Sequence, residues 1–187
     1  MANIAFNVAL LSYLISALGY TFYLVYRESV VNLISAVSLG MGLFSHTTTI
    51  VLRSVETGHG PYTTGFEIAS FLAWVIVVIY FLTEYKYKIK DLGAFVIPVA
   101  FLILFYSAFQ SREVLLIDES STMFWLTMHR TLSIIGYAAF AIAFGVALMY
   151  LIQENQVKSK KLGVMYFRMP SLEVLDELNY KVIAIGF

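Results

Sequence analysis

The chain contains no cysteine and few charged residues. The absence of cysteine excludes disulfide exchange, thiolate catalysis and thiolate ligation of a metal for these 187 residues. Charged residues make up 13% of the chain and hydrophobic residues 60%, whereas about a quarter of a soluble domain is charged. Twelve basic and twelve acidic residues cancel, which gives no reason to expect nucleic acid or acidic substrates as partners. The composition is that of a membrane protein.

Recognisable soluble-enzyme motifs are also missing. Gly58 and Gly60 follow no strand and are too few for a phosphate loop. Glu56 and Glu67 are separated by a turn rich in glycine and proline, which does not fix them as an acid and base pair. There is no heptad pattern or fixed-period repeat, which excludes coiled coils and solenoids. The first apolar run lacks a basic region before it, so we interpret it as a retained helix and not as a signal peptide.

Five stretches run without a charged residue for long enough to cross a bilayer. A hydrocarbon core about 30 Å thick needs about 20 apolar helical residues. Four stretches meet this length, and the third meets it with its flanks. We therefore predict an all-α fold, a single integral membrane domain over residues 1–187, built as a polytopic transmembrane helix bundle. Its five spans are expected at residues 1–26, 29–52, 68–83, 92–111 and 131–153.

The basic residues divide unevenly between the two sides of this bundle. If the spans alternate, one side holds only three of them, Arg53, Arg112 and Arg130. The positive-inside rule makes the other side cytoplasmic and predicts that the N-terminus and the loops at 54–66 and 112–129 lie outside. The cytoplasmic side holds Arg27, Lys86, Lys88, Lys90, Lys158, Lys160, Lys161 and Arg168.

The C-terminal part continues on the cytoplasmic side. Pro170 and Ser171 mark a helix start, after which Leu172, Leu175 and Leu178 recur at helical spacing. We predict a cytoplasmic linker over residues 156–180 whose amphipathic helix lies along the membrane surface. Residues 182–187 are apolar but too few to span, so we expect them to begin a sixth transmembrane helix. The polypeptide is therefore expected to be part of a larger machine.

The three histidines all fall on or near the outer half of the predicted bundle. His129 lies where an outer loop enters the fifth helix, directly after Trp125 and its neighbours. Its imidazole is a candidate axial ligand of haem iron, or a structural hydrogen-bonding group. His46 lies inside the second helix among hydroxyl residues, which either mark a site or satisfy the ring. His59 lies in a turn and is interpreted as a loop residue.

Three further charged residues are candidates for the same outer site. Arg53 and Arg130 can pair with carboxylates such as haem propionates, or extend to lipid headgroups. Glu67 begins the third helix, where it either faces the outer cavity or caps the helix N-terminus. The candidate cofactor-binding residues are therefore His129, Arg130, Trp125, His46, Arg53 and Glu67.

The order of these segments resembles the cytochrome c assembly protein family of the CcsA and ResC type. Residues 158–163 and 168–173 add to the likeness, which covers essentially the whole chain. Four stretches carry it: Ser45-His46-Thr47 with Leu52-Arg53; Gly58-His59-Gly60-Pro61 with Phe66-Glu67 and Trp74; Trp125-Leu126-Thr127-Met128-His129 with Gly136-Tyr137-Ala138-Ala139-Phe140; and Met149-Tyr150-Leu151-Ile152-Gln153-Glu154.

The resemblance implies a bacterial inner-membrane protein of system II cytochrome c biogenesis, with its outer loops periplasmic. It would bind haem b as cargo, with His129 as the iron ligand, and present it outside to apocytochrome c. The implied partners are a CcsB or ResB-type membrane subunit, apocytochrome c, thiol-reducing proteins and membrane lipid. The chain would act within a cytochrome c synthase (haem lyase) complex and not as a stand-alone enzyme. The family's tryptophan-rich motif, second external histidine and further intramembrane histidine have no counterpart here, since Trp74 and Trp125 are the two tryptophans.

Two other functions stay open at this point. One is a b-type electron carrier in which His46 and His129 hold one haem between the second and fifth helices. The other is a structural or permease-like membrane subunit that binds no haem. The haem absorption spectra of variants that lack His46 or His129 would separate these two functions from the assembly function.

Overall fold

The computed structural model describes residues 1–113, 123–160, 163, 166–167 and 169–187. Across these residues the chain is helical and contains no strand. Five of the described helices are long and apolar enough to cross a membrane, which confirms the predicted fold class. The elements are α1 (Ala2–Tyr26), α2 (Ser29–Thr57), α3 (Gly65–Tyr87), the 3₁₀ turn η1 (Lys90–Leu92), α4 (Gly93–Ser107), α5 (Met123–Lys158) and α6 (Leu172–Gly186).

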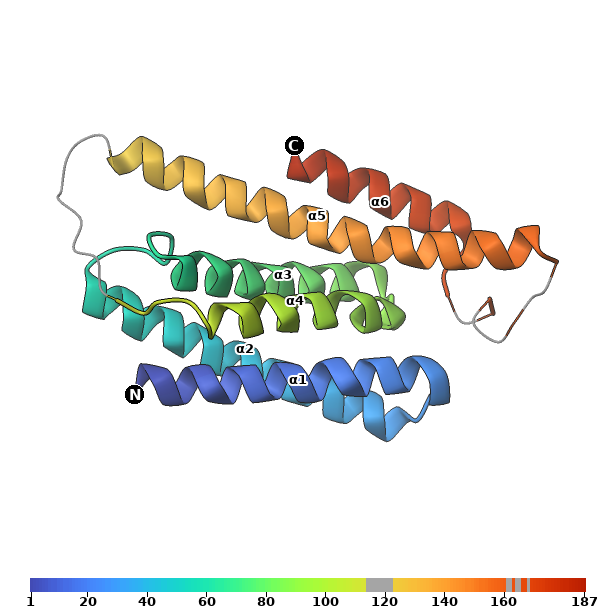
Figure 1. Ribbon diagram of the computed structural model, residues 1–187. Helices are drawn as coiled ribbons and strands as arrows, with labels where there is room; N and C mark the ends of the chain where they lie inside the picture. The colour runs from blue at the N-terminus through green and yellow to red at the C-terminus, as the bar shows by residue number, and fades with distance from the viewer. Residues whose placement is uncertain (114–122, 161–162, 164–165, 168) are drawn as a thin grey trace.

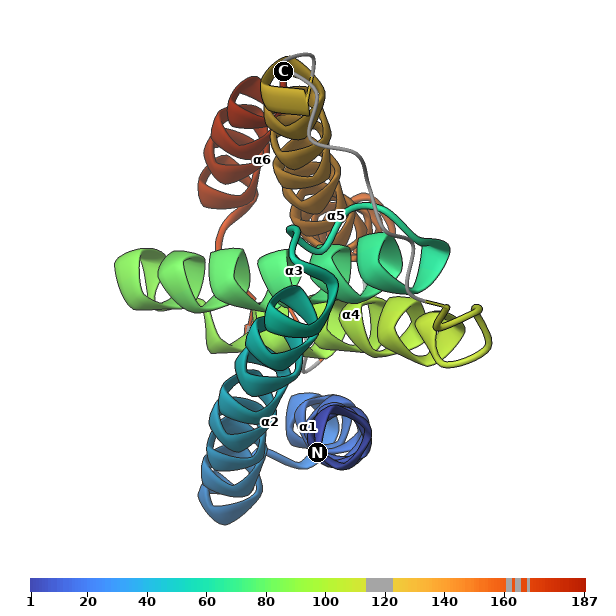
Figure 2. The same ribbon diagram turned by 90° about the vertical axis from the view of Figure 1, so that its left-hand side faces the viewer.

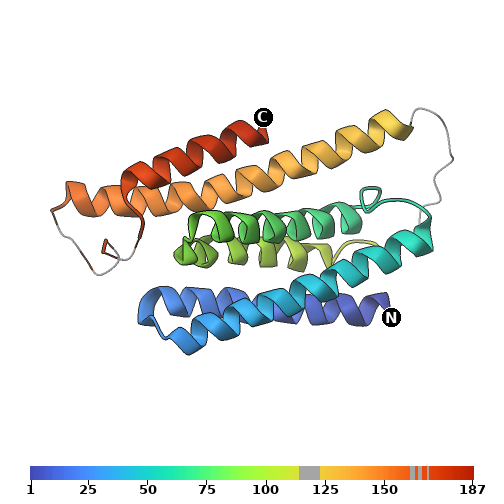
Figure 3. The ribbon, with the colours of Figure 1, turned by 180° about the vertical axis from the view of Figure 1, so that it is seen from behind.

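The helices form three layers. α1 packs closely on α2, α3 and α4 form the middle layer, and α5 and α6 lie on its other side (Figures 1 and 2). α1 reaches the middle layer mainly through α4, and α5 mainly through α3. The His46 helix, α2, and the His129 helix, α5, are therefore on opposite sides of α3 and α4 (Figure 3).

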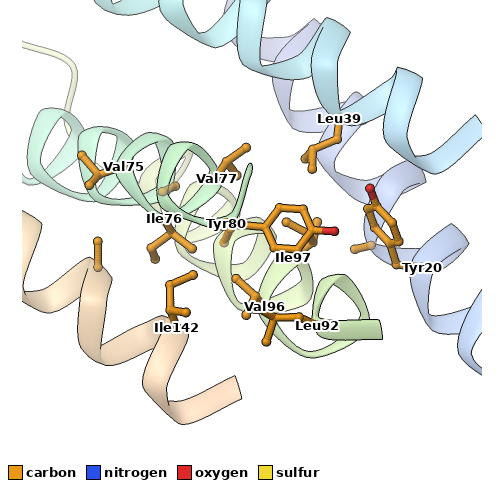
Figure 4. Close-up of a cluster of buried hydrophobic side chains, with 14 of the residues drawn as sticks. Tyr20, Leu39, Val75, Ile76, Val77, Tyr80, Leu92, Val96, Ile97 and Ile142 are labelled. Carbon is orange, nitrogen blue, oxygen red and sulfur yellow. The ribbon is translucent and has the colours of Figure 1, made fainter. Parts of the chain in front are cut away.

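The core lies where the layers meet. Tyr80 and Ile76 of α3 are fully buried and point toward residues of α1, α4 and α5, among them Tyr20 and Ile142 (Figure 4). Apolar side chains recur around α3 and α4 because both helices are covered on two sides, as expected for helices inside a bundle. The outward faces of α1, α2 and α5 instead expose large apolar side chains, which fits a surrounding of lipid.

Two ends of the bundle can be distinguished. We call one the amino-terminal end; it carries Met1, the 58–64 loop, residues 110–113 and the first turns of α5 (Figure 1). The opposite, lysine end carries the α1–α2 turn, the α3–α4 turn and the end of α5. Among the described residues, Arg27, Lys86, Lys88, Lys90, Lys158 and Lys160 belong to the lysine end, so the predicted alternation of the loops is confirmed. Residues 161 and 168, and residues 114–122 of the predicted outer loop, lie outside the described residues. The assignment of the amino-terminal end to the outside stays a prediction.

α5 is longer than predicted at both ends. It begins at Met123, not at residue 131, and continues to Lys158. Trp125 and His129 therefore lie in the first two turns of a helix and not in a loop. The predicted boundary followed the charge of Arg130, but one charged residue at the end of an apolar helix does not stop the helix.

α6 also differs from the prediction. The expected surface helix and the expected start of a sixth span are one continuous helix, which runs back antiparallel beside α5 (Figures 1 and 3). Ser171 caps its start, because the hydroxyl accepts from the amide of Val174. Leu175, Leu178 and Val182 form one buried stripe. That stripe packs on α5, which explains why the helix does not lie across the end of the bundle.

Candidate functional site

The first turns of α5 present an exposed aromatic and apolar face with a histidine in it. His129 is exposed, and no hydrogen bond to its ring is present among the described residues. Trp125, one turn before it, is 76% exposed, and Leu132, almost one turn after it, is 59% exposed. Residues at these spacings share one side of a helix. His129 thus combines an accessible imidazole with an apolar surface on which a flat ring can lie.

The same face is hollowed further along α5. A shallow pocket of about 300 Å³ is lined by Leu132, Gly136, Phe140 and the end of α6. A Cβ at Gly136 would come within 2.8 Å of the carbonyl oxygen of Gly186, so glycine allows α6 to approach here. Gly136 is seven residues, or two turns, beyond His129, on the same side of the helix. The exposed face therefore continues from His129 into a concave surface between α5 and α6.

One hydrogen bond fixes the start of α5 to the loop before α3. The hydroxyl of Thr127 donates to the hydroxyl oxygen of Tyr62 at 3.2 Å. Thr127 is two residues from His129, so its side chain points to a different side of the helix. The bond therefore ties the Thr127 side of α5 to the 58–64 loop, and the side of α5 that carries His129 stays open. Arg130, the next residue, is half-buried.

His46 is in a different setting. Its ring is fully buried inside the bundle. Nδ1 lies 3.2 Å from the hydroxyl oxygen of Tyr13, and Nε2 lies 2.9 Å from Oγ of Ser70. Both ring nitrogens are thus engaged with hydroxyl groups from α1 and α3. Of the two interpretations of His46, this geometry favours the interhelical hydrogen bonds over an iron ligand.

Arg53 and Glu67 form a buried ion pair. Nε of Arg53 lies 3.0 Å from Oε1 of Glu67, and their side chains are 10% and 2% exposed. The other oxygen of Glu67 accepts from the amides of Thr63 and Thr64, while Thr64 Oγ1 accepts from the Glu67 amide. This is a complete capping box, so the capping interpretation of Glu67 is confirmed. Arg53 donates to Glu67 and to the Glu113 carbonyl oxygen, each at 3.0 Å.

His59 is held by its own loop. Its Nδ1 donates to the Gly60 carbonyl oxygen at 2.8 Å and lies 3.2 Å from the Thr63 hydroxyl. These contacts belong to the turn that precedes the capping box of α3. They agree with the interpretation of His59 as a loop residue.

The six predicted site residues therefore fall into two groups. Trp125, His129 and Arg130 lie within six residues of one helix at the amino-terminal end. His46, Arg53 and Glu67 belong to the packing of α2 against its neighbours, and the structure does not bring them to His129. Sequence reasoning did not single out Tyr62 and Thr127, which lie 65 positions apart. Within the described residues, no group of three or more histidine, aspartate or glutamate side chains is arranged to hold a bare metal ion.

Comparisons with known proteins identify relatives of this chain. CcsA, the cytochrome c biogenesis protein of Guillardia theta, is 25% identical over 99% of this chain and 68% of its own length. The CcsA protein of Chlorella vulgaris is 27% identical over 79% of this chain and 57% of its own length. Protein HemX of Brevibacillus brevis is 28% identical over 73% of this chain and half of its own length. No solved structure matches the chain.

The chain thus spans half to about two thirds of the length of these relatives. The family model described as "Cytochrome C assembly protein" matches residues 62–187. This match covers the loop from Tyr62 onward, the capping box of α3, the exposed face of α5 and all of α6. With its helical bundle and five described helices that are long and apolar enough to span a membrane, this chain belongs to the cytochrome c assembly protein family.

Proposed function

We propose that this chain takes part in cytochrome c biogenesis by binding haem at the amino-terminal end of α5, with His129 as an axial ligand of the iron. The haem is cargo: it is bound, held in the membrane and passed to apocytochrome c. Haem b is the form that carries free vinyl groups for attachment, so we propose it as the bound species. The family membership supports the pathway, and the geometry of α5 supports the site.

One observation carries the assignment. His129 is exposed and carries no hydrogen bond from the described residues, whereas both nitrogens of His46 are engaged and His59 is bonded within its loop. An iron ligand must offer a lone pair toward a space that the porphyrin can enter. His129 meets this condition in the present structure. Trp125 and Leu132 flank it and offer apolar contacts to a porphyrin face.

Arg130 is the proposed partner of the propionates. It follows His129 directly and lies at the end of a span, where a guanidinium can pair with a carboxylate of a ligand seated on α5. The axial ligand and the exclusion of water set the reduction potential of bound haem iron. The residues of this chain contribute the ligand nitrogen, an apolar surface and a positive charge, and the covalent chemistry on apocytochrome c belongs to other components.

We further propose that the amino-terminal end faces the periplasm of a bacterial inner membrane. The concentration of lysine at the opposite end supports this orientation by the positive-inside rule. Since the chain has no cysteine, thiol reduction of apocytochrome c is assigned to separate thiol-reducing proteins. A CcsB or ResB-type subunit is the proposed source of further haem contacts, because His129 offers only one axial ligand.

The two rival functions have less support. A single haem shared by His46 and His129 would have to cross the layer formed by α3 and α4, and both nitrogens of His46 already have partners. A subunit without haem does not account for an accessible histidine inside an exposed aromatic face. No observation on the described residues favours either rival.

Haem titration of the purified chain in detergent micelles tests the proposal. The wild type should develop a Soret band typical of histidine-ligated haem. His129→Gly should lose it at the same haem concentration and regain it when free imidazole is added, because imidazole fills the vacated ligand position. His59→Ala and His46→Gln serve as matched controls and should keep the band. Retention of the band by His129→Gly, or its loss in His59→Ala, would show that the ligand is assigned wrongly.

A further inference from the structure

A second pocket lies at the amino-terminal end, on the far side of the bundle from α5. It encloses about 500 Å³ between the first turns of α1, the end of α2, the start of α3 and Arg112. Asn3, Phe6, Arg53, Glu56, Phe66 and Arg112 are among its lining residues. Most of its lining residues are on α1 and α2, and Figures 1 and 2 show these helices on the opposite side of α3 and α4 from α5. The pocket is therefore separate from the proposed haem site.

Two guanidinium groups share one aromatic ring in this pocket. The guanidinium carbon of Arg112 lies 4.9 Å from the ring centre of Phe66 and 4.7 Å from that of Phe6. The guanidinium carbon of Arg53 lies 5.7 Å from the ring centre of Phe66. Arg53 is neutralised by Glu67, as described above. Among the described residues no carboxylate lies within 4 Å of the Arg112 guanidinium, so no described acidic side chain neutralises it.

The Arg112 side chain is held in place by contacts with its neighbours. One of its terminal nitrogens donates to the side-chain oxygen of Asn3 at 2.7 Å. The guanidinium carbon lies over the rings of Phe6 and Phe66, and such cation–π contacts stabilise a cation without neutralising it. A guanidinium has five N–H donors, and the bond to Asn3 uses one. The arrangement leaves a positive, fork-shaped group at the wall of a pocket large enough for a headgroup.

The surroundings of the pocket are apolar on the side of α1 and α2. Ile4 is 70% exposed and Val55 is 78% exposed, and both lie within a turn of pocket residues. In a membrane these side chains meet acyl chains at the level where headgroups begin. Among the described lining residues Glu56 is the one acidic side chain and is exposed, whereas Arg53 and Arg112 are basic. A ligand that fits this place has an anionic head and an apolar tail.

We propose that this pocket binds the phosphate of an anionic phospholipid, with Arg112 as the principal contact and Asn3 as the residue that positions it. Phosphate oxygens match the planar fork of a guanidinium and accept two N–H bonds from it. The lipid tail would lie along the exposed faces of α1 and α2. The site would anchor the amino-terminal end at the membrane surface, independently of haem.

Native mass spectrometry of the full chain, released from micelles that contain phosphatidylglycerol, tests this proposal. We expect Arg112→Gln to weaken phosphatidylglycerol binding by about fivefold or more, the loss of one charged hydrogen-bonding partner. Arg130→Gln removes the same charge at the same end but outside the pocket, and should change binding less than twofold. Asn3→Ala, which leaves the charge in place, should give an intermediate loss and serves as a second variant if Arg112→Gln does not fold.

Two further experiments test whether the bound anion is a lipid headgroup or free phosphate. Phosphatidylcholine, which has a phosphate but no net charge, should bind more weakly than phosphatidylglycerol. Inorganic phosphate at the lipid's concentration should not displace the lipid, because it lacks the tail. Equal weakening by Arg112→Gln and Arg130→Gln would overturn the site. Displacement by inorganic phosphate, or equal binding of the two lipids, would overturn the assignment to an anionic lipid.

Discussion

Arg53 in α2 and Glu67 in α3 join the two helices through a buried ion pair 3.0 Å long. The pair also completes the start of α3, since the second oxygen of Glu67 accepts two amides there. One carboxylate thus neutralises a buried cation and caps a helix. Removal of either partner leaves the other charge without compensation in a region of low dielectric, which is the costly case for a buried pair.

We predict that Glu67→Ala lowers the free energy of unfolding in micelles by about 3–5 kcal/mol, the range for breaking a buried pair. Glu67→Gln should cost less, because the amide oxygen still accepts hydrogen bonds at the helix start. The double variant Arg53→Met with Glu67→Gln should recover part of the loss, since no unpaired charge is then left. Denaturant titration followed by circular dichroism measures these three variants and Arg53→Met alone. Additive losses in the double variant would contradict the coupling.

The hydroxyl setting of His46 predicts a structural role for it. His46→Ala removes two hydrogen bonds, each with a net contribution of about 1 kcal/mol, and leaves Tyr13 and Ser70 facing a cavity. We expect a loss of stability of about 2–4 kcal/mol, with cavity formation adding to the lost bonds. Tyr13→Phe, which deletes one of the two bonds and keeps the ring, should cost about 1 kcal/mol. Haem affinity of the folded fraction should be unchanged in both variants, and a parallel loss of haem would revive the electron-carrier function.

The spans could be predicted from sequence because length and absence of charge are local properties. The pairing of Arg53 with Glu67 could not, because nothing local joins two charges on different helices. The start of α5 was missed for a related reason: Phe124 to Met128 are compatible with an interfacial loop or a helix, and the charge of Arg130 suggested a boundary. For α6, the leucine stripe showed that a face is buried but not whether lipid or another helix covers it. Its position in the sequence and its resemblance to a family motif make His129 a candidate ligand, whereas its accessibility is seen only in the folded chain.

Two glycines of α2 offer a matched test of how closely α1 approaches. A Cβ at Gly42 would lie 2.8 Å from a ring carbon of Tyr13, whereas a Cβ at Gly40 would meet nothing within 4 Å. Gly42→Ala should therefore destabilise the protein by about 1–3 kcal/mol through overpacking. Gly40→Ala should be neutral or stabilise by up to about 1 kcal/mol, because alanine favours a helix. Thermal unfolding in micelles compares the two, and equal effects would mean that the α1–α2 contact is looser than described.

The attachment of the α5 start to the 58–64 loop can be tested from both sides. Tyr62→Phe and Thr127→Val each delete the hydrogen bond of 3.2 Å and keep the shape of the side chain. Gly60→Ala should act in the same way, because its Cβ would meet a ring carbon of Tyr62 at 2.1 Å and displace the ring. We expect each change to raise amide hydrogen exchange in the first turns of α5 by about threefold to tenfold, since a net hydrogen bond contributes about 1 kcal/mol to a local opening. The middle of α5, around Ala138 and Ile142, is buried and should show no change. If the first turns exchange as in the wild type in all three variants, the loop does not position His129, and packing of α5 on α3 alone must do so.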